Sequence, residues 1–316
     1  MSLDLLDTPV RLTWDLHGAE PSLDHGAMLA IADAIVAGGV FFVTLEERPL
    51  AHPAVAGVLA RLRAGGCRLS VVCSAGEGEL TVLEGLAAPL PEVQLDAAAF
   101  LADGMLDEAR LRDIVARLRR AGSETALRLT PLKSNLAVIP RLFDFCRAAG
   151  VARFKLPNAR IGDTFQSIPP ADLPRWSDLA AFRDDWLRHP PNLPESLQVD
   201  IHDRFLWEIM TPGDEQARSE YGGCQAANSL GHVDARGTVY ACAAWPEPLG
   251  CLPGASLEEI WQTPRRLAVR QRIAQLPPGC HGCCDYPLCL GGCRGLGEIL
   301  GQAGGGRDLM CRGPRS

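Results

Sequence analysis

Cysteine is the residue type most able to do chemistry in this 316-residue chain, which has 12 of them. Nine lie between Cys224 and Cys311, and a spaced set of seven stands out: Cys224, Cys242, Cys280, Cys283, Cys289, Cys293 and Cys311. Short spacings such as Cys280-x2-Cys283 let two thiolates reach one metal centre from a tight turn. Neighbouring glycines would let backbone amides hydrogen-bond the sulfurs, which stabilises reduced iron–sulfur clusters. These glycines are Gly282, Gly291, Gly292 and Gly295.

Iron–sulfur ligation accounts for these cysteines better than zinc binding, disulfide formation or simple burial does. A structural zinc site uses four ligands in two pairs, whereas this run is denser and less symmetric. Disulfides conflict with the reducing compartment expected of a chain without a secretory signal. Unrelated buried cysteines would not cluster in this way. The step from Cys289 to Cys293 also matches the final x3 step of small ferredoxins, whose last cysteine ligates the other cluster of a pair.

Length and charge restrict the class of protein around this centre. At about 150 residues per domain, the length suggests roughly two domains. The apolar fraction of 47% and the charged fraction of 22% are ordinary for a soluble globular protein. The 31 basic and 38 acidic residues give a net charge of -7, so nucleic acid and anionic membranes are poor expected partners. The start MSLDLLDTPV has no basic n-region, and we expect a cytoplasmic protein.

The first 212 residues alternate strand and helix patterns. Strands are expected at 11–16, 40–45, 68–74, 92–95, 124–129, 153–156 and 197–201. Helices are expected at 24–37, 54–64, 79–87, 107–121, 134–149, 173–187 and 204–210. The alternation predicts an α/β fold of parallel strands with right-handed crossovers, forming an open sheet or a partial or complete barrel. Glycine and cysteine become frequent near Pro212, which predicts two domains, 1–212 and 213–316.

The seven-cysteine pattern resembles the SPASM domain, the C-terminal auxiliary-cluster module of many radical SAM peptide-modifying enzymes. CQAANSLGHVDARGTVYAC (224–242) is similar to the family's hairpin, in which D-x-x-G makes the turn. PLGCLPGASLEEIW (248–261) and CDYPLCLGGCRG (284–295) resemble its P-L-G-N…S-L-E-E-I-W and Y-x-L-C-x-G-G-C-R segments. The resemblance extends over residues 224–311.

This resemblance implies two [4Fe–4S] clusters. One ligand set, called the four-cysteine site below, would be Cys280, Cys283, Cys289 and Cys311. The other, called the three-cysteine site, would be Cys224, Cys242 and Cys293. The family often has a fourth cysteine shortly before the first, but residues 214–223 contain none. The second cluster is therefore incomplete, takes a non-cysteine ligand such as His232 or His281, or uses Cys251, which stands where the family usually has Asn.

Two residues beside the ligand cysteines have less certain roles at this stage. Cys284 adjoins Cys283 and is expected to point away from the cluster. Arg294 follows Cys293, and two roles fit it equally. It would act on a cluster through its charge or a hydrogen bond, or it would form a surface salt bridge.

The first half resembles a radical SAM barrel more weakly and lacks the catalytic parts. VFFVTLEERPLAHPAV (40–55) is similar to the second strand and the G-G-E-P-L-x-H-P motif, and VVCSAG (71–76) and LPNARIG (156–162) also resemble barrel segments. The family's C-x3-C-x2-C follows its first strand, whereas residues 13–29 have no cysteine, and Cys67, Cys73 and Cys146 are isolated. Side chains replace the motif's glycines at 45–49. We expect a degenerate, partial (β/α)6-type barrel that does not use SAM, followed by a small SPASM iron–sulfur domain.

Other polar residues at the carboxyl ends of the expected strands could serve a different chemistry, since barrel active sites lie there. They are His17, Glu46, Glu47, Asp96 and Lys155, with His52 as a structural relic of the lost motif. No nucleophile, base and orienting group are paired in the sequence, so no catalytic residue is assigned. Three tryptophans are expected in the core: Trp207, Trp245 and Trp261.

The whole chain is similar to the SPASM-domain proteins of GeoRSP systems, which join a cysteine-less radical SAM-like half to an intact seven-cysteine half. The partners implied are an active radical SAM/SPASM enzyme and a PqqD-like peptide chaperone or precursor peptide. The chain would then be a partner that does not cleave SAM and acts in electron transfer or peptide binding. Two alternatives are a stand-alone redox enzyme at the open cluster and a scaffold stabilised by its clusters.

Overall fold

The computed structural model describes residues 5–18, 23–160, 168–191, 196–211, 213, 222–300 and 305–315. They form a mostly parallel α/β structure with two compact units. The first unit comprises residues 1–95, 116–124 and 225–274, and the second comprises 96–115, 125–224 and 275–316. Each unit thus combines early and late parts of the chain. The domain boundary near residue 212 stays a prediction.

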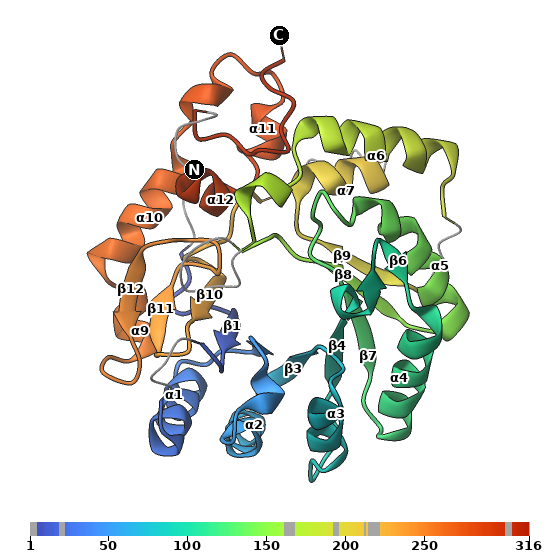
Figure 1. Cartoon of the computed structure of the whole chain (residues 1–316). Helices are drawn as coiled ribbons and strands as arrows, with labels where there is room; N and C mark the ends of the chain where they lie inside the picture. The colour runs from blue at the N-terminus through green and yellow to red at the C-terminus, as the bar shows by residue number, and fades with distance from the viewer. Residues whose placement is uncertain are drawn as a thin grey trace. The chain divides into compact units, whose positions relative to one another are not determined.

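The first unit is built on a sheet in the order β12-β11-β10-β1-β2-β3-β4 (Figure 1). Its strands are β1 (Arg11–Asp15), β2 (Phe42–Glu46), β3 (Arg68–Cys73), β4 (Glu92–Asp96), β10 (Leu230–Val233), β11 (Thr238–Tyr240) and β12 (Pro248–Cys251). The first four are parallel, as the alternating pattern predicts. Strand β10 adds in parallel on the other side of β1, and the β11 and β12 strands continue the sheet antiparallel.

The helices of the first unit are α1 (His25–Ala37), α2 (Val55–Ala64), α3 (Glu77–Glu84), α9 (Leu257–Trp261) and α10 (Pro264–Ala274). Asp24 caps α1, because its Oδ1 accepts from the amide of Ala27 at 2.7 Å. Ser256 and Glu259 form a reciprocal capping box at the start of α9. Trp245 and Trp261 are fully buried, which confirms their expected place in the core.

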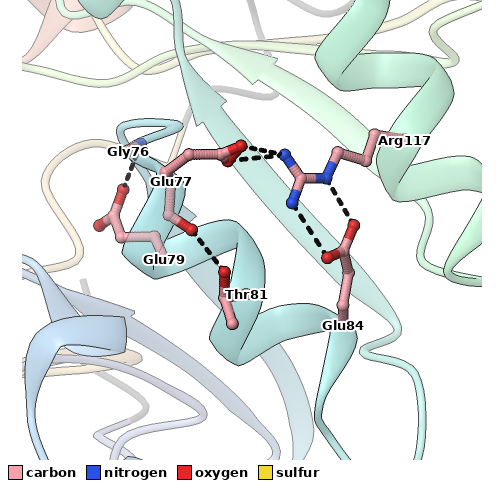
Figure 2. Close-up of polar contacts among 6 residues, drawn as sticks. All are labelled: Gly76, Glu77, Glu79, Thr81, Glu84 and Arg117. Atoms are coloured by element: carbon pink, nitrogen blue, oxygen red, sulfur yellow. Dashed lines mark hydrogen bonds and ion pairs between the residues drawn. The ribbon is translucent and has the colours of Figure 1, made fainter.

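Helix α3 begins two residues earlier than expected. The Glu79 carboxylate accepts hydrogen bonds from the backbone amides of Ser74 and Gly76, which precede the helix. On its outer face, Arg117 of α4 (Glu108–Arg120) bridges Glu77 and Glu84, with Nη1 at 2.6 Å from Glu77 Oε1 and Nη2 at 3.0 Å from Glu84 Oε2 (Figure 2). Such a two-carboxylate clamp fixes the helix more firmly than a single exposed pair does.

The turn between β10 and β11 has the D-x-x-G form that the sequence indicates. The Asp234 Oδ1 atom accepts from the amides of Arg236 (2.9 Å) and Thr238 (2.8 Å). Gly237 has φ +83°, and a Cβ there would lie 2.5 Å from the Leu252 carbonyl oxygen. Glycine is therefore required on both conformational and steric grounds.

The second unit contains three parallel strands in the order β7-β8-β9. These are β7 (Thr125–Arg128), β8 (Arg153–Leu156) and β9 (Gln198–Ile201), with a small hairpin of β5 (Leu101–Ala102) and β6 (Met105–Leu106). Its helices are α5 (Ile139–Ala149), α6 (Trp176–Arg188), α7 (Arg204–Met210), α11 (Tyr286–Cys289) and α12 (Arg294–Ile299). Phe143 packs edge-on against Phe154 and Trp186, at ring separations of 5.0 and 5.5 Å.

The expected start of the fifth helix at residue 134 is wrong, and Ser134 does not cap it. The Ser134 hydroxyl donates to Asp172 at 2.8 Å, and α5 begins only at Ile139, after a 3-10 turn at Leu136–Val138. Pro140 in the first turn of α5 suits this later start. Residues 161–167 and 192–195, within two expected loops, lie outside the described residues. No helix in the described part of the chain is long and apolar enough to cross a bilayer.

Candidate metal centre

The cysteines of the four-cysteine site line a single cavity in the second unit. Phe205 and Tyr286 contribute to its walls, and it encloses about 270 Å³, part of it open to solvent. Cys280 and Cys289 are buried, whereas Cys283 and Cys311 are partly exposed. Four cysteines up to 31 positions apart in the sequence thus line one cavity, and their ligation of a common cluster stays a prediction.

Tight turns set the direction of the first three cysteines. Cys280 ends a 3-10 turn, and its carbonyl accepts from the amide of Cys283 at 3.2 Å. Gly282, between them, takes the left-handed conformation with φ +73°. Cys289 ends α11, after which Leu290, with φ +49°, begins a reversal of the chain. The two residues between Cys280 and Cys283 therefore form a turn that depends on the positive φ of Gly282.

Backbone amides reach three of the four sulfurs. The amide of Gly313 donates to Cys311 Sγ at 3.3 Å, that of Arg315 donates to Cys283 Sγ at 3.4 Å, and that of Gly291 donates to the thiol of Cys289. The sequence pattern anticipates only the contribution of Gly291. Gly282 supplies a turn instead, and Gly295 lies inside α12. Hydrogen bonds of this kind stabilise thiolate ligands and tune cluster potential.

The electrostatics also place the four thiols close together. The pKa of Cys280 is raised to about 11, mainly by burial and then by the neighbouring Cys289, Cys311 and Cys283, in that order. Burial and nearby thiols likewise raise the pKa values of Cys289 and Cys311. Such thiols become thiolates only when a cation compensates their charge, so metal binding here releases protons.

Arg294 is buried beside this site, with only 6% of its surface exposed. Its positive charge lowers the pKa of Cys280, which opposes the larger effect of burial. Arg294 therefore does not lie on the surface, and its action on a cluster stays a prediction.

A single zinc ion and a cubane cluster would require different spacings of the four sulfurs. Four thiolates bound to one zinc ion at about 2.3 Å would lie within about 4 Å of one another. Among the described residues, no three His, Cys, Asp or Glu side chains converge on an ion-sized point. A cubane contributes its own iron and sulfide atoms, so its cysteine ligands stand around a larger volume.

The cysteines of the three-cysteine site belong to different units. Cys224 and Cys293 lie in the second unit, and Cys242 lies just after β11 in the first. Gly223 packs beside Leu290, since a Cβ on it would lie 2.8 Å from Leu290 Cδ1. The Cys224 segment thus contacts the loop that leads to Cys293. The common cluster of these three cysteines stays a prediction, and residues 214–221 lie outside the described residues.

A buried carboxylate, Asp308, organises the backbone around Cys293. Its Oδ2 accepts from the amide of Cys293 at 2.6 Å, and its Oδ1 accepts from the amide of Met310 at 2.8 Å. Gly292 permits this approach, because a Cβ there would lie 2.6 Å from Asp308 Oδ2. Burial and the nearby Asp308 raise the pKa of Asp203, which caps α7, to about 8. Neither aspartate belongs to a motif, so neither could be identified from the sequence.

The register of β11 and β12 argues against Cys251 as a cluster ligand. Cys251 pairs with Thr238, at the end of the β11–β12 hairpin away from its turn, and its Sγ lies 3.5 Å from the carbonyl oxygen of Leu252. Cys242 lies four residues beyond Thr238, roughly 13 Å away along an extended chain. Cys251 is also exposed, so this geometry disfavours it as a ligand, and its ligation stays a prediction.

The other spare residues near the cysteines are also placed. Cys284 is exposed and does not line the cavity. His281 is exposed. His232 is fully buried, with Nδ1 2.8 Å from Thr13 Oγ1 and Nε2 3.4 Å from Asp15 Oδ2. Both nitrogens of His232 face these partners, which argues against a ligand role. Trp207 is half-buried under the guanidinium of Arg204.

The loop after β2 contains two non-glycine residues in the left-handed backbone conformation that glycine usually adopts. Glu47 and Arg48 both adopt left-handed conformations, with φ +52° and +50°. This costs about 1–2 kcal/mol for each residue relative to glycine. The amides of Leu16 and His17 donate to the carbonyls of Glu46 and Glu47, both at 3.2 Å. The loop after β1 therefore joins this loop, although neither contains a cysteine.

His17 and His52 lie near each other in this region, with ring centroids 6.4 Å apart. His52 is buried, and its Nδ1 accepts from the amide of Ala54 at 3.1 Å. Burial, followed by the nearby His17 and His25, lowers its pKa. The lowered pKa means that the folded loop favours the neutral form of the His52 ring.

The remaining strand-end candidates do not form a reactive constellation in the described structure. Asp96 caps a 3-10 turn, because its Oδ1 accepts from the amide of Ala98 at 3.0 Å, and burial raises its pKa. Lys155 lies in β8 of the second unit. Glu46 is buried at the end of β2, opposite Asp15 of β1.

The three isolated cysteines are separately buried. Cys67 donates to the carbonyl of Val40 at 3.2 Å. Burial raises the pKa values of Cys73 and Cys146 to about 12. These thiols are therefore unreactive and supply no substitute for the missing three-cysteine motif.

Comparison with known proteins gives a domain match for residues 224–284 and a fold similarity for the chain as a whole. Residues 224–284 match the SPASM iron-sulfur cluster-binding domain. No curated protein matches the sequence significantly. The fold is similar to that of SuiB from Streptococcus suis bound to S-adenosylmethionine, with a TM-score of 0.67, 14% identity, and coverage of 98% of this chain and 78% of that one.

Two further solved structures have similar folds. SuiB bound to the precursor peptide SuiA has a TM-score of 0.64, with 14% identity over 98% of this chain and 77% of that one. Native anSMEcpe with bound AdoMet has a TM-score of 0.62, with 11% identity over 91% of this chain and 90% of that one. At these identities the likeness shows the fold alone. Residues 224–284 thus match an iron–sulfur cluster-binding domain, and the chain as a whole is similar in fold to SuiB and anSMEcpe.

Proposed function

We propose that this protein binds two [4Fe–4S] clusters and serves, without cleaving SAM, as an electron-transfer partner in a radical SAM peptide-modifying system. The observation that carries this proposal is the cavity lined by Cys280, Cys283, Cys289 and Cys311. When bound there, a cluster supplies one-electron redox capacity. The protein contributes the thiolates, the amides that reach their sulfurs, and the buried charge of Arg294.

The first unit supports the proposal that SAM is not cleaved here. SAM cleavage in this family needs a cluster held by C-x3-C-x2-C after the first strand, and residues 13–29 contain no cysteine. Glu46 and Glu47 also stand where the glycines of the SAM-contacting motif are expected. A chain that retains its auxiliary cysteines but lacks the radical source fits a supporting role.

A peptide-modifying context is supported by the fold neighbours. SuiB is bound to its precursor peptide SuiA in one structure, and anSMEcpe is bound to the Cp18Cys peptide in another. By analogy, this chain would work beside an active radical SAM/SPASM enzyme, with a PqqD-like chaperone presenting the precursor peptide. The resemblance to the SPASM-domain proteins of GeoRSP systems points to the same set of partners.

Metal analysis tests the cluster content directly. The anaerobically purified chain should contain about 8 iron and about 8 sulfide, or somewhat less if the three-cysteine site is incomplete. Stoichiometric zinc without sulfide would contradict the proposal. Reversible reduction and reoxidation of the clusters would separate an electron carrier from a scaffold, whose clusters need not cycle.

The partnership is tested with any radical SAM/SPASM enzyme that is encoded beside this chain, together with its precursor peptide. In a single-turnover assay, we expect the product yield to rise when this chain is added. A chain with the Cys280→Ala and Cys289→Ala substitutions is the matched control and should give no such rise. An equal yield with and without the intact chain would contradict the partnership.

A further inference from the structure

The chain that follows Cys311 folds back to the four-cysteine site. Residues 312–315, called the strap below, return to the turn that contains Cys283. The amide of Arg315 donates to Cys283 Sγ at 3.4 Å, and the carbonyl oxygen of Arg315 accepts from the amide of Cys284 at 2.9 Å. Both backbone groups of one strap residue are thus paired with two consecutive residues of the site.

A side-chain contact holds the same strap residue. Arg315 Nε lies 2.9 Å from Asp285 Oδ2, and Arg312 Nη2 lies 3.9 Å from the same oxygen. The backbone of Asp285 is itself fixed, because its carbonyl oxygen accepts from the amides of Leu288 and Cys289 in α11. The Asp285 side chain is only 25% exposed, so water and salt screen this ion pair less than one on the open surface. Asp285 therefore anchors the strap.

The course of the strap places it between the cysteines and solvent. Gly313 has φ +106°, which residues with a side chain rarely adopt, and its amide donates to Cys311 Sγ at 3.3 Å. Pro314, the next residue, lines the four-cysteine cavity. Arg312, Gly313 and Arg315 line a larger cavity together with three of the four cysteines, and its volume of about 820 Å³ includes space open to solvent. The strap therefore forms part of the boundary between the cysteine cavity and solvent.

We propose that the strap, closed by the ion pair of Arg315 and Asp285, controls the access of small molecules to the cluster of the four-cysteine site. The inference rests on the cluster binding of the proposed function and adds Arg315 and Asp285 as positioning residues. Neither residue binds iron; they act by keeping the strap closed. When the ion pair breaks, the strap opens locally while Cys311 stays a ligand. The shell around a metal site controls how solvent reaches it.

Access is measured by the rate at which a bulky, anionic iron chelator, bathophenanthroline disulfonate, bleaches the cluster-loaded protein under anaerobic conditions. The four-cysteine phase of bleaching is the one that Cys280→Ala/Cys289→Ala lacks. We expect Arg315→Gln to accelerate this phase about fivefold, because loss of the ion pair shifts the strap toward its open form. Asp285→Asn should accelerate it at least as much. Arg315→Lys, which keeps the charge, should accelerate it less than about twofold.

The matched control is Arg183→Gln. Arg183 has the same 40% side-chain exposure as Arg315, lies 2.9 Å from its own partner Asp184 and lines the same larger cavity, but it belongs to α6 and not to the strap. Both substitutions remove one positive charge near the path of an anionic chelator. Loss of charge alone slows the approach of the chelator, whereas opening of the strap speeds bleaching. Arg183→Gln should therefore not accelerate the four-cysteine phase.

The outcomes separate this inference from the function beneath it. Faster bleaching confined to the four-cysteine phase, with an unchanged free energy of unfolding and rescue by Arg315→Lys, would support the strap. Equal rates in Arg315→Gln and the unaltered chain would overturn the strap and leave cluster binding intact. Faster bleaching that accompanies a lower free energy of unfolding and is not rescued by Arg315→Lys would also overturn it, because general destabilisation then explains the loss. An unaltered chain that assembles no cluster would contradict both the proposed function and the strap.

Discussion

In the second unit, four cysteines line one cavity, and backbone amides reach three of their sulfurs. In the first unit, the loops after β1 and β2 contain no cysteine, yet Glu47 and Arg48 keep left-handed backbone conformations there. The resemblance assigns an iron–sulfur cluster to both places in the wider family. Single substitutions remove side-chain ligands, whereas packing and backbone hydrogen bonds maintain the path of a loop. On the proposed function, the contrast is between a cofactor site that is kept and one that is lost.

Removal of one ligand from the intact site should have the largest effect. In Cys280→Ala, we expect iron and sulfide each to fall from about eight to about four per chain, because a cubane that loses a buried ligand is released. Cys284→Ala and Cys251→Ala should leave both counts unchanged, since Cys284 lies outside the cavity lining and Cys251 lies at the far end of its hairpin. Full iron in Cys280→Ala would contradict the assigned ligand set.

Two glycine variants separate the steric contact between Gly292 and Asp308 from the backbone strain that any residue with positive φ experiences. Gly282 and Gly292 both have positive φ, +73° and +68°, but only Gly292 faces a close neighbour, Asp308. Gly292→Ala should therefore lower the free energy of unfolding by about 1–3 kcal/mol more than Gly282→Ala does. It should also lose iron faster during anaerobic buffer exchange. Equal effects in denaturant titrations would show that Asp308 does not depend on Gly292.

The strain retained in the first unit predicts a stabilising substitution. We expect Glu47→Gly to be more stable than Glu47→Ala by about 1 kcal/mol, since both lose the same side chain and only alanine meets the left-handed penalty. Denaturant titration measures this difference. A more stable alanine variant would mean that the loop does not hold the left-handed conformation at Glu47.

A smaller, pH-dependent effect is expected at His52. Its pKa is lowered by burial and by the nearby His17 and His25, so the folded state binds fewer protons than the unfolded state. Its contribution is thus intact above its ordinary pKa of 6.5 and declines as the pH falls from that value toward the lowered one. His52→Gln should remove this decline in stability, whereas the exposed His189→Gln should not. A parallel decline in all three proteins would exclude His52 as the cause.

Much of the fold could be predicted from local patterns. The alternation of strand and helix segments predicts β1 to β4 and their parallel order, and the D-x-x-G turn at 234–237 is visible directly. The addition of β10 beside β1 could not be predicted, because it joins segments about 220 residues apart through backbone pairing alone. Helix α5 starts late because a tertiary contact, between Ser134 and Asp172, outcompetes the local capping pattern.

The same division holds for the candidate site. The grouping of the four cysteines is what the family resemblance implies. The roles of Asp203 and Asp308 do not, because a lone aspartate has no signature and the two meet only through folding. The amides of Gly313 and Arg315 were missed because any residue can present an amide to a sulfur. Glycine in the Cys-Arg-Gly-Pro run at 311–314 is the one clue in the sequence.

An EPR spectrum of the dithionite-reduced protein, recorded with and without SAM, tests both halves of the contrast together. We expect the signal of a reduced [4Fe–4S] cluster in the intact chain. If only the four-cysteine site contributes, Cys280→Ala/Cys289→Ala should abolish the signal. If both clusters contribute, this variant should lose the part of the signal that comes from the four-cysteine site. Addition of SAM should leave the spectrum unchanged, since no cysteine motif follows β1 to hold a SAM-binding cluster. A SAM-dependent shift of the signal, or the absence of any cluster signal in the intact chain, would contradict the account.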